Sequence, residues 1–287
     1  MKIIRTLYGE FSDSEVDFLI SLGIKIKRNF CNRIYIDDEE KYSLVLNKLS
    51  KTLERSSPFS YKLALLNLNR IYTYSKEEIQ QSNYCYFHIP IGGGYPQPEE
   101  KFMEITYDKT RCCKCGIPLI QTNNFRINKI SNRPLWGFTA WIYDVIFVHE
   151  DFYKQIFEPL GIKCRPVEKV SGKIREGVVQ LMFPITDETL NLPYHYVETC
   201  PICGSKKYRP WGHMPFYPEH KHPLPNMFLT QEMFGSGWEF SRDVIISSKL
   251  AMKLLELKAI KMDSLIPCRK DFEEYLKNNP DLIPYRR

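Results

Sequence analysis

The stretches Cys112-Cys113-Lys114-Cys115-Gly116 and Cys200-Pro201-Ile202-Cys203-Gly204 decide how this sequence is interpreted, because each is a Cys-x-x-Cys-Gly motif. Two such pairs supply the four thiolates of a tetrahedral zinc site, and the glycine relieves the backbone where it turns over the sulfurs. We therefore expect one structural Zn²⁺ site with four ligands: Cys112, Cys115, Cys200 and Cys203. Cys113 also lies inside the first motif, but Cys112 gives the same spacing as the second.

The separation between the two pairs differs from that of an ordinary zinc ribbon. Cys200 follows Cys115 by 85 positions (200 − 115), against roughly 15–20 in the common spacing. A metal ion here would hold two distant chain segments together, and a closed four-cysteine site leaves no open position for a substrate. We therefore expect a structural centre without catalysis. A redox pair, an iron–sulfur cluster and unliganded thiols are the alternatives.

Each motif is followed by a similar unit, which suggests a divergent internal duplication. The first unit runs from Asp144-Val145-Ile146-Phe147 through a helical stretch to Gly161-Ile162-Lys163-Cys164. The second runs from Asp243-Val244-Ile245-Ile246 to Ala259-Ile260-Lys261-Met262. We expect strand, helix and strand in each, so that residues 105–287 form a zinc-binding region with two duplicated knuckle units joined by one metal site. Chance similarity between two apolar strand–helix units is the alternative.

Residues 1–100 are expected to form a separate α/β region, so the whole chain is predicted to be an α+β protein. Ser12 and Glu15 form a capping-box pattern that opens a helix, and Gly23 ends it. A glycine- and proline-rich stretch over 91–98 indicates a loop or linker. Sequence patterns predict further strands at 24–27, 33–36, 63–68 and 84–89 and a helix over 42–53, and a second capping box, Ser75 with Glu78, predicts a short helix that starts at Ser75.

The composition is globular and mildly basic. The 287 residues carry 40 Lys+Arg against 34 Asp+Glu, a net charge of +6. No apolar run approaches the roughly 20 residues of a membrane span, and no signal-peptide pattern opens the chain. We therefore expect a cytoplasmic protein without a membrane segment, in which cysteines are thiols or metal ligands. The remaining thiols are expected to be buried: Cys31, Cys85, Cys164 and Cys268.

The segment between Gly204 and Phe228 is rich in proline, histidine and aromatic residues. His213, His220 and His222 suggest a second metal site, but solvated loop residues are the favoured interpretation. The tryptophans are expected to pack mainly in the core, or in part to anchor a protein partner: Trp136, Trp141, Trp211 and Trp238. No phosphate loop and no nucleophile motif occurs, so no enzyme is expected.

The two motifs, the long gap between them and the tail Glu232-Met233-Phe234-Gly235-Ser236-Gly237…Asp243-Val244-Ile245-Ile246-Ser247 resemble the bacterial double-CXXCG motif proteins. The resemblance covers roughly residues 110–268, and residues 1–100 match no family by motif. Some members are immunity proteins that neutralise a polymorphic toxin of the same or a kindred cell. The resemblance implies a non-catalytic, zinc-stabilised protein that binds a cognate toxin directly.

A zinc-ribbon-like nucleic-acid-binding module is the competing class. Basic clusters occur at Lys25–Arg28 and at Lys206–Arg209, the second directly after a Cys-x-x-Cys motif. However, nucleic-acid-binding domains concentrate far more positive charge than +6 over 287 residues. A positive charge also suits an acidic protein partner and counts slightly against a basic nuclease toxin.

Overall fold

The computed structural model describes residues 1–9, 11–27, 32–53, 70–89, 94–128, 137–142, 144–192, 195–209 and 214–279. The chain forms two compact units. One contains the described residues up to Ser75 together with Met214 and Pro215, and the other contains the rest. The expected mixture of helices and sheets is confirmed. Some features predicted above lie outside the described residues: the strand at 63–68, Arg28, Cys31, residues 91–93, Trp136, Trp211 and His213.

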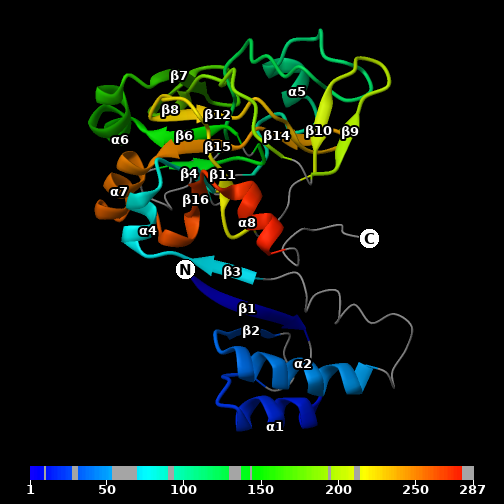
Figure 1. The fold of residues 1–287 in the computed structure, drawn as a ribbon. Helices are drawn as coiled ribbons and strands as arrows, with labels where there is room; N and C mark the ends of the chain where they lie inside the picture. The colour runs from blue at the N-terminus through cyan, green and yellow to red at the C-terminus, as the bar shows by residue number, and fades with distance from the viewer. Residues whose placement is uncertain are drawn as a thin grey trace. The chain divides into compact units, whose positions relative to one another are not determined.

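The first unit is a three-stranded antiparallel sheet with two helices packed against it (Figure 1). Its sheet has the order β2-β1-β3. Its elements are β1 (Lys2–Gly9), α1 (Asp13–Ser21), β2 (Asn32–Ile36), α2 (Glu39–Leu53) and β3 (Arg70–Thr73). Leu7 of the sheet and Leu19 and Val45 of the helices are buried in one shared core. The core therefore lies between the sheet and the helices.

The capping box of α1 forms as predicted, whereas the strand predicted at 24–27 does not. The backbone N–H of Ser12 donates to the Glu15 carboxylate at 2.7 Å. After the helix, the Ile24 N–H donates back to the Leu19 carbonyl at 3.0 Å. Ile24 and Ile26 pack against the core of this unit without pairing to a strand. Their alternation therefore reflects packing rather than a β-ladder.

The second unit contains a four-stranded sheet and a five-stranded sheet that share one arrangement. The first has the order β5-β6-β8-β7 and the second β11-β16-β4-β15-β12. The strands of the first are β5 (Gly137–Thr139), β6 (Ile146–His149), β7 (Lys163–Glu168) and β8 (Ile174–Met182). The strands of the second are β4 (Tyr84–Phe87), β11 (Tyr217–Pro218), β12 (Met227–Leu229), β15 (Val244–Ser247) and β16 (Leu265–Arg269).

The first predicted strand–helix–strand segment forms in this unit, but in the second the residues predicted as the closing strand, 259–262, are a turn and the start of η3 (Met262–Ser264), and the strand β16 begins only at Leu265. β6 leads through α6 (Glu150–Phe152) and the π-helical turn η1 (Tyr153–Phe157) toward β7, while β15 leads through α7 (Ser248–Glu256) toward β16. In each sheet the two strands run parallel, because both pair antiparallel with one strand inserted between them. The inserted strand is β8 in the first sheet and β4 in the second.

β4 falls within the first hundred residues, yet it belongs to the second unit, which begins at Lys76. It pairs with β15 and β16. The Ser248 N–H at the start of α7 donates to the Asn83 carbonyl at 3.0 Å, just before β4. The central strand of the five-stranded sheet, β4, therefore lies far upstream of its neighbours β15 and β16 in the sequence.

A third sheet and several short helices complete the second unit. The third sheet has the order β14-β13-β10-β9. Its strands are β9 (Val197–Thr199), β10 (Lys206–Tyr208), β13 (Phe234–Ser236) and β14 (Glu239–Ser241). The helices are α4 (Lys76–Gln81), α5 (Phe102–Thr106), η2 (Glu158–Leu160), η3 (Met262–Ser264) and α8 (Phe272–Asn278). Across the described ranges, no helix combines the length and apolar character needed to cross a bilayer.

Candidate metal centre

The four cysteines of the two motifs meet at one point in the second unit. The Sγ atoms of Cys112 and Cys200 lie 3.8 Å apart, and those of Cys115 and Cys203 lie 3.4 Å apart. All four Sγ atoms lie within 4.8 Å of one another. A Zn–S bond of about 2.3 Å in a tetrahedral site sets S···S separations of about 3.8 Å. The four sulfurs therefore fit a metal ion, whereas disulfide sulfurs would lie about 2.05 Å apart.

The two Cys-x-x-Cys turns have the same backbone hydrogen bonds. The Gly116 N–H donates to the Cys112 carbonyl at 2.8 Å, and the Gly204 N–H donates to the Cys200 carbonyl at 3.0 Å. The first cysteine of each motif also donates its N–H across the turn, to Ile117 at 2.9 Å and to Ser205 at 2.9 Å. Gly116 and Gly204 have φ of +77° and +74°, a left-handed conformation that favours glycine. The motif glycines are therefore required by the turn itself.

Each turn connects two chain segments that pair antiparallel. Cys200 and Cys203 lie between β9 and β10, where Thr199 pairs with Lys206. Cys112 and Cys115 lie between the bridge partners Tyr107 and Gln121, and the Asp108 N–H donates to the Ile120 carbonyl at 2.8 Å. A bound metal ion would thus hold two hairpins together that are distant in sequence.

The four thiols differ in their surroundings. Cys115 and Cys200 are buried, Cys112 is half-buried and Cys203 is exposed. Burial raises the pKa of Cys115 to about 12. The pKa of Cys203 is lowered to about 6, mainly by the Ser205 hydroxyl, which lies 3.2 Å from its Sγ. Cys203 is therefore the solvent-exposed thiol of the four, and the Ser205 hydroxyl favours its thiolate form.

Lys207 is a part of this centre that the sequence analysis assigned to a basic surface cluster. Its side chain is only 3% exposed. The ammonium Nζ donates to the Cys115 carbonyl at 2.6 Å and to the Gly237 carbonyl, and lies 3.8 Å from the Phe240 ring centroid. Burial lowers the pKa of Lys207, while the neighbouring thiolates favour its charged form. This lysine therefore places a positive charge beside the sulfurs.

Trp238 and Phe240 cover the first turn. A Cβ atom at Gly116 would lie 3.1 Å from the Trp238 ring and 3.2 Å from the Phe240 ring. The outer face of Trp238 remains in solvent, with the residue 51% exposed, and Trp141 is 48% exposed. The expectation of core tryptophans is therefore wrong for these two, because Trp238 packs onto a surface turn on one side only.

The other predicted thiols and histidines have mixed outcomes. Cys85 and Cys268 are buried as predicted, but Cys164 is exposed because its end of β7 faces solvent. The expectation of solvated histidines is wrong for His220, which is buried, and His222 is exposed as predicted. Within the described ranges, only the four motif cysteines form a group of three or more metal-ligating side chains.

Comparisons of the chain with protein-family models, curated proteins and solved structures found no match. The metal centre is therefore interpreted from its own geometry and chemistry.

Proposed function

We propose that Cys112, Cys115, Cys200 and Cys203 bind one structural Zn²⁺ ion. Four thiolate donors with near-tetrahedral spacing suit zinc, and the two hairpins bring all four sulfurs to one point. Zinc bound by four cysteines has no open coordination position for water or substrate. A non-catalytic role follows, in which the metal stabilises the fold that assembles the site.

We further propose that the second unit arose by duplication of a segment that begins with a central strand. The second motif follows the first by 88 positions (200 − 112), and β15 follows β6 by 98 (244 − 146). The hairpin of β13 and β14 lies between the second motif and β15. β4 precedes the first motif and β8 the second, and each forms the centre of the other repeat's sheet. An exchange of the central strands between the two repeats would explain why both sheets have the same arrangement of strands.

The function that these features support best is that of a binding protein. We propose a bacterial immunity protein that neutralises a cognate polymorphic toxin by direct binding. The observation that supports this proposal is the meeting of the four cysteine sulfurs at one point, where a bound Zn²⁺ would supply rigidity rather than a reaction site. The motif resemblance indicates the class of partner, and a rigid, preorganised surface reduces the entropic cost of binding it.

Capture of the partner followed by a growth assay tests this proposal. The tagged full chain is incubated with lysate of the source cells, with and without nuclease, and retained polypeptides are identified. We expect one polypeptide near stoichiometry in both arms, which arrests growth when expressed alone and is harmless when expressed with this chain. A retained polypeptide that is harmless by itself, or toxicity unchanged by co-expression, would contradict the immunity function.

The buried position of Lys207 argues against the nucleic-acid-binding alternative. Of the predicted cluster, Lys206 is exposed, Lys207 points into the protein, and the Arg209 guanidinium lies 4.9 Å from the Tyr196 ring centroid. Charge reversal by Lys206→Glu with Arg209→Glu distinguishes the two classes. If the chain binds DNA or RNA and this double variant loses that salt-dependent binding, the nucleic-acid module is the better description.

A further inference from the structure

β9 forms one edge of the third sheet, and its outer side has no partner strand among the described residues (Figure 1). The Arg209 N–H donates to the Tyr196 carbonyl at 3.0 Å, on the inner side of the strand. Because successive strand residues direct their backbone groups to opposite sides, the N–H and carbonyl groups of Val197 and Thr199 point away from β10. No described residue forms a hydrogen bond with them.

This outer edge of β9 has none of the usual features that prevent a strand from pairing. Edge strands are commonly blocked by lysine, by proline or by a covering segment. β9 contains neither lysine nor proline, and all three of its residues are exposed. Val197 is 38% exposed, and Tyr196, directly before the strand, is 54% exposed. The edge is therefore able to accept an additional strand.

The charges along the edge are self-complementary. Glu198 and Arg209 are both exposed, and neither has an ion pair with another described residue. The Arg209 guanidinium lies 4.9 Å from the Tyr196 ring centroid. Tyr196 and Glu198 lie on the same face of the sheet, because they are two residues apart on one strand. Lys207 pairs with Glu198 across the ladder, but its ammonium is turned inward to two backbone carbonyls.

We infer that the edge of β9 pairs antiparallel with the same edge of a second copy of this chain, with the two-fold axis at Val197. In this register the two Val197 residues exchange two backbone hydrogen bonds, and Glu198 of each copy lies opposite Tyr196 of the other. Each Glu198 carboxylate then meets the Arg209 guanidinium over that tyrosine. A two-fold axis at Glu198 would instead place two carboxylates opposite each other, which is unfavourable. This association goes beyond binding of a toxin.

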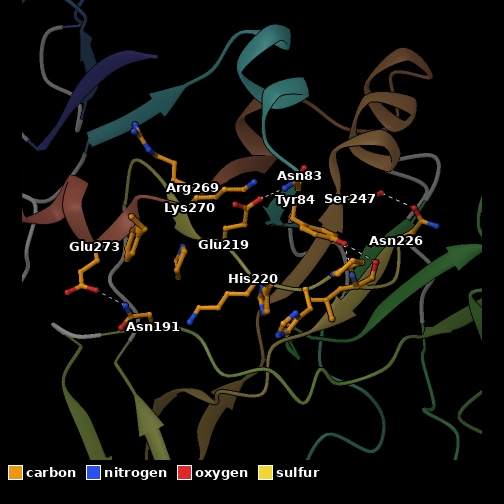
Figure 2. Close-up of a pocket in the computed structure, with 16 residues that line it drawn as sticks. Asn83, Tyr84, Asn191, Glu219, His220, Asn226, Ser247, Arg269, Lys270 and Glu273 are labelled. Carbon is orange, nitrogen blue, oxygen red and sulfur yellow. Dashed lines mark hydrogen bonds between the residues drawn. The ribbon is translucent and has the colours of Figure 1, made fainter.

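The pocket of about 770 Å³ drawn in Figure 2 is a separate feature of the second unit. Its walls come mainly from the start of β4, the segment 218–224, the end of β16 and the start of α8, and no residue of β9 or β10 lines it. Lys270 lines this pocket and is exposed. Substitution of Lys270 therefore changes a charge of the same unit outside the edge of β9.

Analytical ultracentrifugation of the zinc-loaded full chain, over a wide range of protein concentration, tests the inference. We expect a reversible equilibrium between monomer and dimer. Val197→Pro removes the outward N–H of each copy, a change that edge strands tolerate where the N–H faces solvent. It should weaken dimerisation about tenfold or more, since both central hydrogen bonds are lost. Val197→Ile keeps the N–H and should dimerise like the unmodified chain.

Two charge reversals test the register. Glu198→Arg alone and Arg209→Glu alone each bring like charges together across the interface. Each variant should therefore be monomeric at concentrations at which the unmodified chain is a dimer. An equimolar mixture of the two variants should form a heterodimer, because both contacts then join opposite charges. Lys270→Glu should leave the association unchanged.

The two charge variants alter exposed side chains, so they test the inference even if Val197→Pro fails to fold. A chain that stays monomeric up to millimolar concentration would overturn the inference. A dimer that persists in Val197→Pro and in both charge variants would also overturn it, as would a mixture of the two charge variants that does not associate.

Discussion

Lys206 and Lys207 are neighbours in sequence with opposite environments, so a matched pair of substitutions tests the account of the metal centre. Lys207→Met removes the buried ammonium but keeps an unbranched side chain of similar length. Lys206→Met makes the same change on an exposed residue. Any general effect of a lost positive charge is common to both variants. The difference between their free energies of unfolding therefore reports the buried contacts of Lys207.

The expected magnitude follows from the contacts of Lys207. Its ammonium makes two hydrogen bonds to carbonyls, each worth about 1.5–3 kcal/mol for a charged donor. The ring of Phe240 contributes roughly 0.5–2 kcal/mol more. Removing the ammonium also relieves the cost of its desolvation, which offsets part of this sum. We expect Lys207→Met to lower the free energy of unfolding by about 2–4 kcal/mol, and Lys206→Met to change it by at most about 0.5 kcal/mol.

Urea unfolding in zinc-containing buffer measures both variants, with the midpoint and slope giving the free energy of unfolding. Competition with a chelator should also show that Lys207→Met releases zinc at a lower chelator concentration, since a charge beside the thiolates is lost. Equal free energies of unfolding for the two variants would refute the buried position of Lys207 and the reasoning built on it.

Three further perturbations test other parts of the structure. Cys115→Ser should abolish stoichiometric zinc binding, as measured by elemental analysis. It should also lower the free energy of unfolding by about 4–5 kcal/mol, because the metal no longer closes an 85-residue loop. Cys113→Ser should keep the metal, because Cys113 is exposed and lies outside the cluster. Gly235→Ala should lower the stability measured in thermal melts by about 2–4 kcal/mol, because φ is +137° and a Cβ would lie 2.1 Å from the Glu239 carbonyl oxygen. Gly177→Ala should lower the stability less, because the space around Gly177 is open. Equal losses of stability in the two variants would count against the β13–β14 geometry. Removal from water raises the pKa of Asp243 to about 7, so the native carboxyl holds its proton where the unfolded one releases it, and the free energy of unfolding falls as pH rises from about 4 to about 7. The free energy of unfolding of Asp243→Asn should therefore rise relative to that of the unmodified chain as the pH increases from about 4 to about 7. If the difference between the two free energies does not change with pH, the pKa of this carboxyl is not raised.

The sequence contained enough information to predict that the four motif cysteines come together. Two motifs with identical spacing specify the turn, and the glycine after each pair specifies its left-handed backbone. Prediction of α1, of α7 and of strand β15 likewise depended on local signals, a capping box or an apolar run, which the structure confirms. Local chemistry was therefore sufficient to predict these elements.

Long-range pairing was not predictable in the same way. The strand predicted at 84–89 forms as β4, but its sequence says nothing of its partners β15 and β16, which lie far downstream. The strand pattern of Ile24–Lys27 was equally clear, yet those residues pack on a core with no ladder. Lys207 and His220 are polar residues in polar surroundings along the chain, and only the assembled fold buries them.

X-ray absorption spectroscopy at the zinc edge, on the purified full chain, tests the central claim most directly. The account predicts one zinc ion per chain with four sulfur ligands at about 2.3 Å. A first coordination sphere containing nitrogen or oxygen, or a well-folded chain that takes up no zinc when its thiols are fully reduced, would contradict it.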